Sequence, residues 1–433
     1  LSEAYRHLCE LGPVGERERS LAAAAAEWLA AAGGAALLRG DPPAGARLLE
    51  RAVSLLEFDD AARGELLPEL GASLFDAGRM EDATRVLDEA IARAPEQRLE
   101  ARAQVERELV RLETEPSVGT EDARRVTDAV LPLLERENDD YGQCRVWLLR
   151  GQLAWNAGRV LTADEAWSEA AESARRAGDL RALYEVIGWR ATAAVLGPTP
   201  VDEAIRRCEE FRELVHESQF TTAATINALA LLHAMKGESE IAGHLLEEAS
   251  EILHELGSLS AGWSHLVALV RLLAGQPALA EAPLRADIQT LSSVSGGSAL
   301  ATTTALLAQA VYAQGRMHEA GELCRTTHNQ AATEDTITQV IWRGVEAKIV
   351  AREGRCEEAE ALAREALALI EPTDLLSHHG DAMLDLADVL RTCSRTEESD
   401  RATQTGLELY EVKGNAAAAA RARSLLRNRP GGR

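Results

Sequence analysis

The seven residues Ala77-Gly78-Arg79-Met80-Glu81-Asp82-Ala83 set the pattern of this 433-residue chain. They recur in similar form as Gln314-Gly315-Arg316-Met317-His318-Glu319-Ala320 and as Glu353-Gly354-Arg355-Cys356-Glu357-Glu358-Ala359. The central glycine belongs to a series with intervals of 38 to 41 residues, which comprises Gly40, Gly78, Gly119, Gly158, Gly197, Gly237, Gly275, Gly315 and Gly354. Ser394 continues the series 40 residues later. A fixed period of roughly 20–50 residues is typical of repeat proteins, so we expect one array rather than several unrelated domains.

Each residue of this series is expected to lie in the turn of a helical hairpin. Glycine ends a helix by adopting a left-handed conformation, and a second helix then begins two or three residues later. The residues seven positions before the turn and five positions after it are small in eight of ten repeats. Mid-helix Gly33, Gly71 and Gly151 each cost about 1 kcal/mol relative to alanine, so their shared register indicates close helix packing. The repeats that turn at Gly119 and Gly197 lack both small residues and are degenerate.

Small residues at these positions match the packing signature of tetratricopeptide repeats, and the chain resembles that family from about Arg17 to Val412. Its period of about 39 rather than 34 residues implies longer helices, of about 17 residues or roughly 25 Å. The prediction is an all-α, right-handed superhelical solenoid of about ten helical hairpins. We expect residues 1–16 to be a helix or linker from a preceding domain and residues 17–412 to form the ten repeats. Residues 413–433 should form a capping helix and a basic tail.

Both ends of the array resemble the C-terminal region of large actinobacterial regulators. The resemblance rests on Leu11-Gly12-Pro13-Val14 before the first hairpin and on Leu409-Tyr410-Glu411-Val412-Lys413-Gly414-Asn415-Ala416 after the last. In those proteins an adenylate/guanylate-cyclase-like domain and a STAND-type signalling ATPase precede a repeat tail. The resemblance implies a sensing or scaffolding role, with the catalytic machinery upstream of Leu1. Two alternatives stay open, namely a structural self-association module and the repeat segment of a large LuxR-type transcriptional regulator.

Composition narrows the classes of partner and compartment. The formal charge of −24 and the pI near 4.9 disfavour a nucleic-acid binder, which needs a basic face. Apolar stretches such as Trp28 to Leu38 are shorter than the roughly 18 residues that span a membrane, and no secretory signal opens the chain. Six scattered cysteines without a C-x-x-C pair favour free thiols in a reducing cytoplasm; they are Cys9, Cys144, Cys208, Cys324, Cys356 and Cys393. We therefore expect a cytoplasmic bacterial protein with no nucleic-acid or membrane partner.

Catalytic and metal-binding patterns were sought among the residue types that such chemistry requires. None of the three lysines completes a G-x-x-x-x-G-K-[ST] phosphate loop, and neither H-E-x-x-H nor G-x-S-x-G occurs. The sequence thus predicts that this chain is not an enzyme and holds no cofactor. Four histidines (His233, His244, His254 and His265) suggest a metal site, but the spacings of 10 and 11 around His254 do not place them on one helical face. We expect no metal site.

The candidate binding residues lie on the predicted first helix of each hairpin. In tetratricopeptide arrays the first helices line a concave groove, and the family pattern places groove residues 3, 6, 10 and 13 positions before each turn. Polar groups with aromatic anchors suit recognition of a protein, a peptide or a small-molecule effector. The candidates are Arg145, Gln152, Trp155, Tyr184, Asn227, His265, Gln309, Tyr312, Lys348 and Arg352. Ordinary packed or surface positions are an equally open interpretation.

Two further features complete the expectations. Trp28, Trp263 and Trp342 each lie twelve residues before a turn, and we expect them to pack between adjacent repeats. The segments 197–200 and 292–298 are irregular, because the first contains two prolines and the second is rich in serine and glycine. Each is expected either to hinge the array or to accommodate an insertion.

Overall fold

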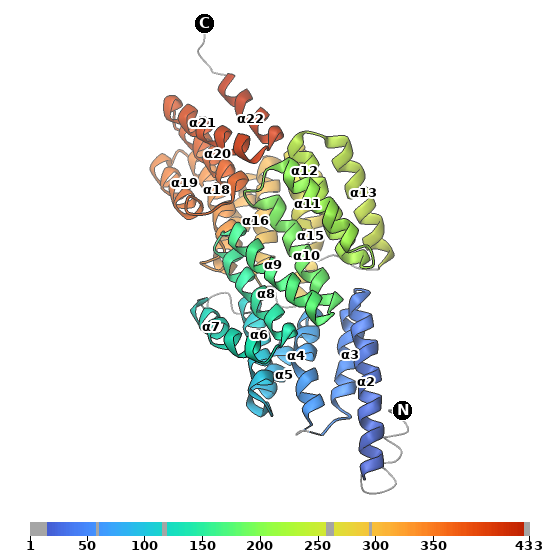
Figure 1. Ribbon diagram of the computed structural model, residues 1–433. Helices are drawn as coiled ribbons and strands as arrows, with labels where there is room; N and C mark the ends of the chain where they lie inside the picture. Colours follow the sequence, from blue (N-terminus) through green and yellow to red (C-terminus); the bar gives the residue numbers. More distant parts are fainter. Residues whose placement is uncertain (1–14, 58–59, 115–118, 257–263, 294–296, 428–433) are drawn as a thin grey trace. The chain divides into compact units, whose positions relative to one another are not determined.

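The computed structural model describes residues 15–57, 60–114, 119–256, 264–293 and 297–427. Within these ranges the chain forms 21 α-helices and no strand (Figure 1). The first ten are α2 (Glu16–Leu38), α3 (Pro42–Val53), α4 (Ala61–Asp76), α5 (Met80–Arg93), α6 (Gln97–Thr114), α7 (Glu121–Arg136), α8 (Asp140–Asn156), α9 (Val160–Ala177), α10 (Leu180–Leu196) and α11 (Val201–Leu214). The others are α12 (Gln219–Lys236), α13 (Ser239–Glu255), α14 (Ser264–Leu273), α15 (Pro277–Ser293), α16 (Gly297–Ala313), α17 (Met317–Gln330), α18 (Thr336–Arg352), α19 (Cys356–Ile370), α20 (Leu376–Thr392), α21 (Thr396–Lys413) and α22 (Ala416–Arg427).

Successive helices pair as hairpins, from α2–α3 to α20–α21, and every residue of the predicted turn series lies between the two helices of a pair. The predicted all-α helical-repeat class is therefore confirmed. The chain divides into two compact units, and the division falls within α8, α9 and α10. The first unit comprises residues up to 150 together with 169–186, and the second comprises residues 151–168 together with 187–433.

Most hairpin turns have the left-handed backbone that the glycine series predicts. At position 394 the chain uses serine instead, and Ser394 adopts a φ of 63°. Gly119 departs from the prediction, and so does Gly197, because their φ angles do not lie in the left-handed region. The turn at Gly197 contains Pro198 and Pro200, which lack backbone N–H groups, so it cannot form the usual hydrogen bonds of a glycine-ended helix.

The mid-helix glycines permit close helix packing, as their register predicts. A Cβ on Gly71 would lie 2.5 Å from the side chain of Leu87, and one on Gly151 would lie 2.1 Å from the indole nitrogen of Trp167. At Gly33 the nearest side-chain atom would lie at 3.1 Å. Leu87 and Trp167 are fully buried and each lies nine residues after its turn. A large side chain of the second helix thus occupies the space that glycine leaves on the first.

An arginine directly after the turn connects neighbouring hairpins. In the first unit Arg79 lies 2.8 Å from Glu50 of the preceding hairpin and 2.6 Å from Asp82 of its own helix. In the second unit Arg316 pairs in the same way with Glu281, at 2.7 Å. Each of these pairs joins a hairpin to the one before it.

The second unit closes on itself through contacts of its first two hairpins with Asp374 and Lys413 near its end. The carboxylate of Asp374, in the loop between α19 and α20, accepts hydrogen bonds from the backbone N–H groups of Val160 (2.7 Å) and Leu161 (2.8 Å). Those N–H groups begin α9 and have no partner within the helix, and the positive end of the helix dipole favours an anion there. Asp374 therefore joins residues more than 210 positions apart.

Lys413, the last residue of α21, makes the second closing contact. Its Nζ donates hydrogen bonds to the carbonyl oxygens of Ala194 (3.1 Å), Gly197 (2.7 Å) and Thr199 (2.6 Å). The residue four positions after Ala194 is Pro198, which has no N–H to donate, so Lys413 supplies a donor that the backbone lacks. The side chain is fully buried. This arrangement favours a fixed turn at 197–200 over a hinge.

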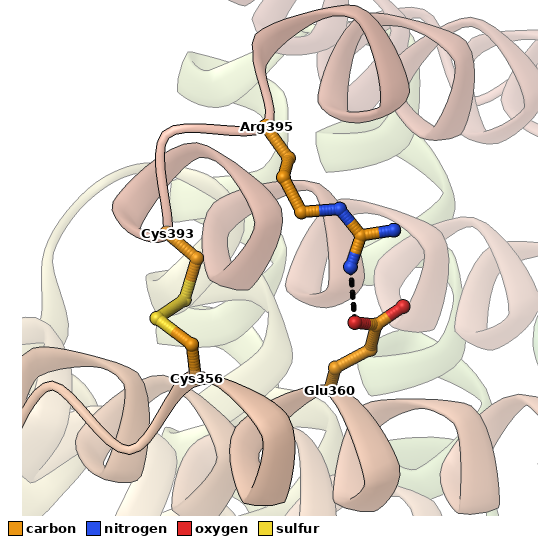
Figure 2. Close-up of a disulfide and its surroundings, with 4 residues drawn as sticks. All are labelled: Cys356, Glu360, Cys393 and Arg395. Carbon is orange, nitrogen blue, oxygen red and sulfur yellow. Dashed lines mark hydrogen bonds and ion pairs between the residues drawn. A yellow bond between two sulfur atoms is a disulfide. The ribbon is translucent and has the colours of Figure 1, made fainter.

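The expectation that all cysteines are free thiols is wrong for one pair. Cys356 and Cys393 form a disulfide with a Cα–Cα distance of 5.8 Å (Figure 2). They are 37 residues apart, which is nearly one repeat, so equivalent ends of adjacent hairpins bring them together. Cys144, Cys208 and Cys324 are free and buried, whereas Cys9 lies outside the described residues.

Two expectations about the first hairpin also need correction. Helix α2 has 23 residues and a mean hydropathy of 1.6 over its most apolar window, so by length and composition alone it is long enough to cross a membrane. It nevertheless packs one face on α3, with Ala36 and Leu37 buried. Trp28 of the same helix is 71% exposed rather than packed between repeats, because no earlier helix covers it among the described residues.

Other expectations have mixed outcomes. Trp342 is buried as predicted, and its indole N–H donates to the side-chain oxygen of Gln339 at 3.0 Å. Trp263, residues 1–14, residues 294–296 of the serine-rich connection and the basic tail 428–433 lie outside the described residues.

Candidate functional site

Five side chains gather on the first helices of three consecutive hairpins in the second unit. Helix α16 contributes an aromatic ring, α18 contributes two cations four residues apart, and α20 contributes two carboxylates three residues apart. Spacings of three and four residues place side chains on one face of a helix, so each helix presents its groups together. We call this set the Tyr312 cluster, which consists of Tyr312, Lys348, Arg352, Asp385 and Asp388.

The two cations of the cluster are held between the ring and the carboxylates. Lys348 Nζ lies 2.6 Å from Asp385 Oδ1, and Arg352 Nη2 lies 3.2 Å from Asp388 Oδ2. Lys348 Nζ and Arg352 Cζ lie 4.8 and 5.1 Å from the centre of the Tyr312 ring, within the range of cation–π attraction. The Tyr312 hydroxyl donates a weak hydrogen bond to Asp388 at 3.4 Å.

Exposure divides the cluster into an inner pair and an outer pair. The Lys348 side chain is 10% exposed, whereas those of Arg352 and Asp388 are 40% and 38% exposed. Burial raises the pKa of Asp385, and the opposing attraction of Lys348 lowers it. Burial also raises the pKa of Tyr312, so its hydroxyl stays protonated and can donate. The inner pair fixes the geometry, and the outer pair keeps donors and acceptors available to solvent.

Three other predicted residues of the second unit have no charged partner in this cluster. Gln309 is half-buried on α16, one turn before Tyr312. His265 Nε2 lies 2.7 Å from the Thr303 hydroxyl, and burial lowers the pKa of His265 to about 4, so the ring is neutral at pH 7. Asn227 is 1% exposed, and its Oδ1 accepts no hydrogen bond.

Gln152 and Trp155 of α8 also belong to the second unit. Gln152 is buried, and its Oε1 accepts no hydrogen bond. Trp155 packs with Trp167 and Trp189, with ring centres 5.5 to 6.2 Å apart. This aromatic packing joins α8, α9 and α10, so for Trp155 the structure favours a packing role over a groove anchor.

In the first unit, Arg145 forms a buried ion network. Its guanidinium donates to both carboxylate oxygens of Glu106, at 2.5 and 2.9 Å, and to Glu185 at 2.8 Å. Glu106 is 1% exposed, and burial raises its pKa while Arg145 opposes that change. Tyr184 is buried on α10 and directly precedes Glu185, a member of this network, in the sequence. Because its partners already occupy the Arg145 guanidinium, we assign Arg145 a structural role.

Of the predicted set, the structure thus brings Tyr312, Lys348 and Arg352 into one cluster, and Gln309 lies one turn from Tyr312 on the same helix. Sequence reasoning missed Asp385 and Asp388. Asp388 lies six residues before the Ser394 turn, the same position that Lys348 occupies before Gly354, so the repeat register could have identified it. Asp385 lies nine residues before its turn, outside the positions of the family pattern.

No model of a known protein family matches the chain, and no curated protein matches its sequence. Among solved structures the chain is similar to a Rap protein complexed with competence and sporulation factor, with 14% identity and a TM-score of 0.59. That similarity covers 82% of this chain and 100% of the Rap chain. NprR in complex with its cognate peptide NprX gives 14% identity and a TM-score of 0.48, covering 67% of this chain and 84% of NprR. Aspartyl phosphate phosphatase F from Bacillus subtilis gives 14% identity and 0.46, covering 83% and 95%. The similarity to the Rap protein, at this identity, supports the helical-repeat fold.

Proposed function

We propose that this chain is a binding module that recognises a protein or peptide partner through the Tyr312 cluster. The observation that carries the proposal is the outer pair of that cluster, in which Arg352 and Asp388 are about two-fifths exposed beside an aromatic ring. An exposed arginine has five N–H donors, and a carboxylate accepts several hydrogen bonds, so both can serve a peptide backbone while paired. Tyr and Arg are also the residue types that dominate binding energy at protein interfaces. The complex of the structurally similar Rap protein with its factor is consistent with this proposal.

The test is selection of binders followed by measurement on matched variants. Peptides would be selected from a random phage-displayed library against the full chain, and their affinities measured by calorimetry. We expect Arg352→Ala and Asp388→Ala to weaken binding about tenfold or more, since each removes a central anchor. The control is Arg325→Ala, because Arg325 is a 66% exposed arginine on the second helix α17 and pairs with Glu322. Selected peptides that bind Arg352→Ala and Arg325→Ala equally well would contradict the proposal.

We further propose that the module belongs to a multidomain bacterial signalling protein of the cytoplasm and is itself not an enzyme. Support comes from the resemblance of the chain ends to regulators with cyclase-like and STAND ATPase domains, and from the missing phosphate loop. Under this proposal a bound partner changes nucleotide turnover in other domains of the polypeptide. Saturating the module in the intact polypeptide without any change in turnover would refute this part.

A second candidate function is self-association, which the exposed apolar face of α2 favours. Trp28 is 71% exposed there, an unusual exposure for a tryptophan of a monomeric surface. Light scattering over a range of concentrations tests this function with the variant Trp28→Glu. The mass of a monomer at every concentration in both proteins would exclude it.

A further inference from the structure

Four side-chain links join the hairpin α18–α19 to the hairpin α20–α21. Along the hairpin α18–α19 these links occur every four residues, so they run from its first helix α18 across the turn to its second helix α19. Three are ion pairs and one is covalent. The links are Lys348–Asp385, Arg352–Asp388, Cys356–Cys393 and Glu360–Arg395.

The covalent link lies where both hairpins turn. Cys356 is the first residue of α19, and Cys393 directly follows α20. Figure 2 shows the disulfide beside the pair of Glu360 and Arg395, which connects the same two hairpins. Both cysteines are partly exposed, unlike the three free cysteines among the described residues, which are buried.

The three described free cysteines differ from this pair in both access and reactivity. Cys144, Cys208 and Cys324 are buried. Burial raises the pKa of Cys144 and Cys208 to about 12, so almost no reactive thiolate forms at neutral pH. Within the described residues, reaction with small thiols and disulfides should therefore be confined to Cys356 and Cys393.

We propose that Cys356 and Cys393 form a reversible redox site that exchanges with low-molecular-weight thiols and disulfides and sets how firmly the two hairpins are joined. In the oxidising direction, the thiolate of one cysteine attacks a sulfur of the small disulfide RSSR, the S–S bond breaks, and one RS⁻ leaves. The second cysteine then attacks the mixed disulfide and releases the second RS⁻. The protein loses two protons and two electrons, and RSSR becomes two RSH.

Two of the three noncovalent links, Arg352–Asp388 and Glu360–Arg395, can replace the disulfide only in part when it is reduced. The side chains of Arg352 and Asp388 are about two-fifths exposed, as is that of Arg395 at 38%, and exposed ion pairs contribute little in water. Arg352 lies four residues before Cys356, and Asp388 lies five before Cys393, so the loosened region includes the outer pair of the Tyr312 cluster. The redox site itself does not depend on whether that cluster binds a partner.

Redox equilibration of the native full chain tests the chemistry. The protein would be held in glutathione buffers of graded oxidised fraction, its free thiols alkylated, and each cysteine peptide quantified by mass spectrometry. We expect Cys356 and Cys393 to convert together between dithiol and disulfide while Cys144, Cys208 and Cys324 stay reduced. A disulfide that is reduced only after denaturation, or a pair that never oxidises in the folded chain, would overturn the proposal.

Hydrogen–deuterium exchange tests the mechanical consequence. Amides of α20 and of the start of α21 should exchange on the order of tenfold faster in the reduced protein, because the cross-link no longer restrains local opening of this hairpin. The control is the double variant Cys356→Ser/Cys393→Ser, which should show the fast rates under both oxidising and reducing conditions. Equal rates in oxidised and reduced wild type, with conversion proven by mass spectrometry, would refute the role of the disulfide in joining the hairpins.

Discussion

Replacing Lys413 by methionine tests the closure of the second unit. Lys413→Met keeps the length and the apolar stem of the side chain but removes every donor from the three carbonyls of the 194–199 segment. Burial lowers the pKa of Lys413 to about 7, with a minor contribution from repulsion by Arg207. At pH 9 the amine is therefore neutral and still donates two hydrogen bonds. Leaving two buried carbonyls unpaired costs about 1–3 kcal/mol each, so we expect a loss of about 2–6 kcal/mol at pH 9.

The pH dependence of that loss has a defined sign. The unfolded chain keeps the Lys413 proton up to a pH near 10.5, whereas the folded chain releases it near pH 7. Between these values the unfolded state binds more protons, so the free energy of unfolding of the wild type rises with pH. The rise approaches about 1.4 kcal/mol per pH unit once the folded amine is neutral and amounts to about 2 kcal/mol from pH 7 to pH 9, and it should be absent in Lys413→Met.

Chemical unfolding followed by tryptophan fluorescence measures this difference, since Trp155, Trp167 and Trp189 report on the second unit. The difference between wild type and variant should shrink as the pH falls from 9 to 7. A difference that grows on acidification would show that the carbonyls stabilise the ammonium form, and the reasoning from burial would fail. Equal stability at pH 9 would show that the closing contact contributes nothing.

Three further predictions concern packing, turn geometry and the buried ion network. Gly151→Ala places a Cβ about 2 Å from a buried indole, so we expect the free energy of unfolding to fall by about 1–3 kcal/mol. Gly243→Ala places its Cβ in open space and should raise the free energy of unfolding by about 1 kcal/mol. Thermal unfolding should show these opposite signs. Ser394→Gly relieves a left-handed φ on a residue with a side chain and should stabilise by about 1 kcal/mol, and a lower melting temperature would contradict this. Arg145→Met leaves a buried carboxylate unpaired and should cost about 3–5 kcal/mol, most of which Arg145→Met/Glu106→Leu should recover; a double variant as unstable as the single one would exclude a pairwise interaction.

The sequence predicted the hairpins well because their turns depend on local chemistry. Glycines such as Gly78 and Gly354 indicate a left-handed backbone, because glycine adopts this conformation without steric cost. Ser394 lies in the same register, which predicts the same backbone there. Close packing at Gly71 was predictable for the same reason. The sequence also places Leu87 in the core, but a leucine in an Ala- and Leu-rich helix does not by itself identify the glycine against which it packs.

The candidate site was only partly predictable because its pairs join different repeats. Register alone places Lys348 and Arg352 on one face of α18, but which carboxylates approach them depends on how hairpins stack. The same holds for the disulfide, since Cys356 and Cys393 lie on opposite sides of two different turns and their 37-residue spacing resembles chance scatter. Lys413 was unremarkable in sequence, because its acceptors are backbone carbonyls more than 210 residues away.

The closing contacts of Lys413 and Asp374 also constrain the order in which the second unit folds. In an open array each hairpin contacts only its neighbours, so a growing chain completes its structure repeat by repeat. Here the start of α9 and the end of α10 acquire their last hydrogen bonds from residues 374 and 413, which are synthesised some 200 residues later. Contacts of such long sequence separation slow folding and make it more cooperative. When only the first half of this unit has been synthesised, the polar groups at the start of α9 and the end of α10 therefore still lack these hydrogen-bond partners.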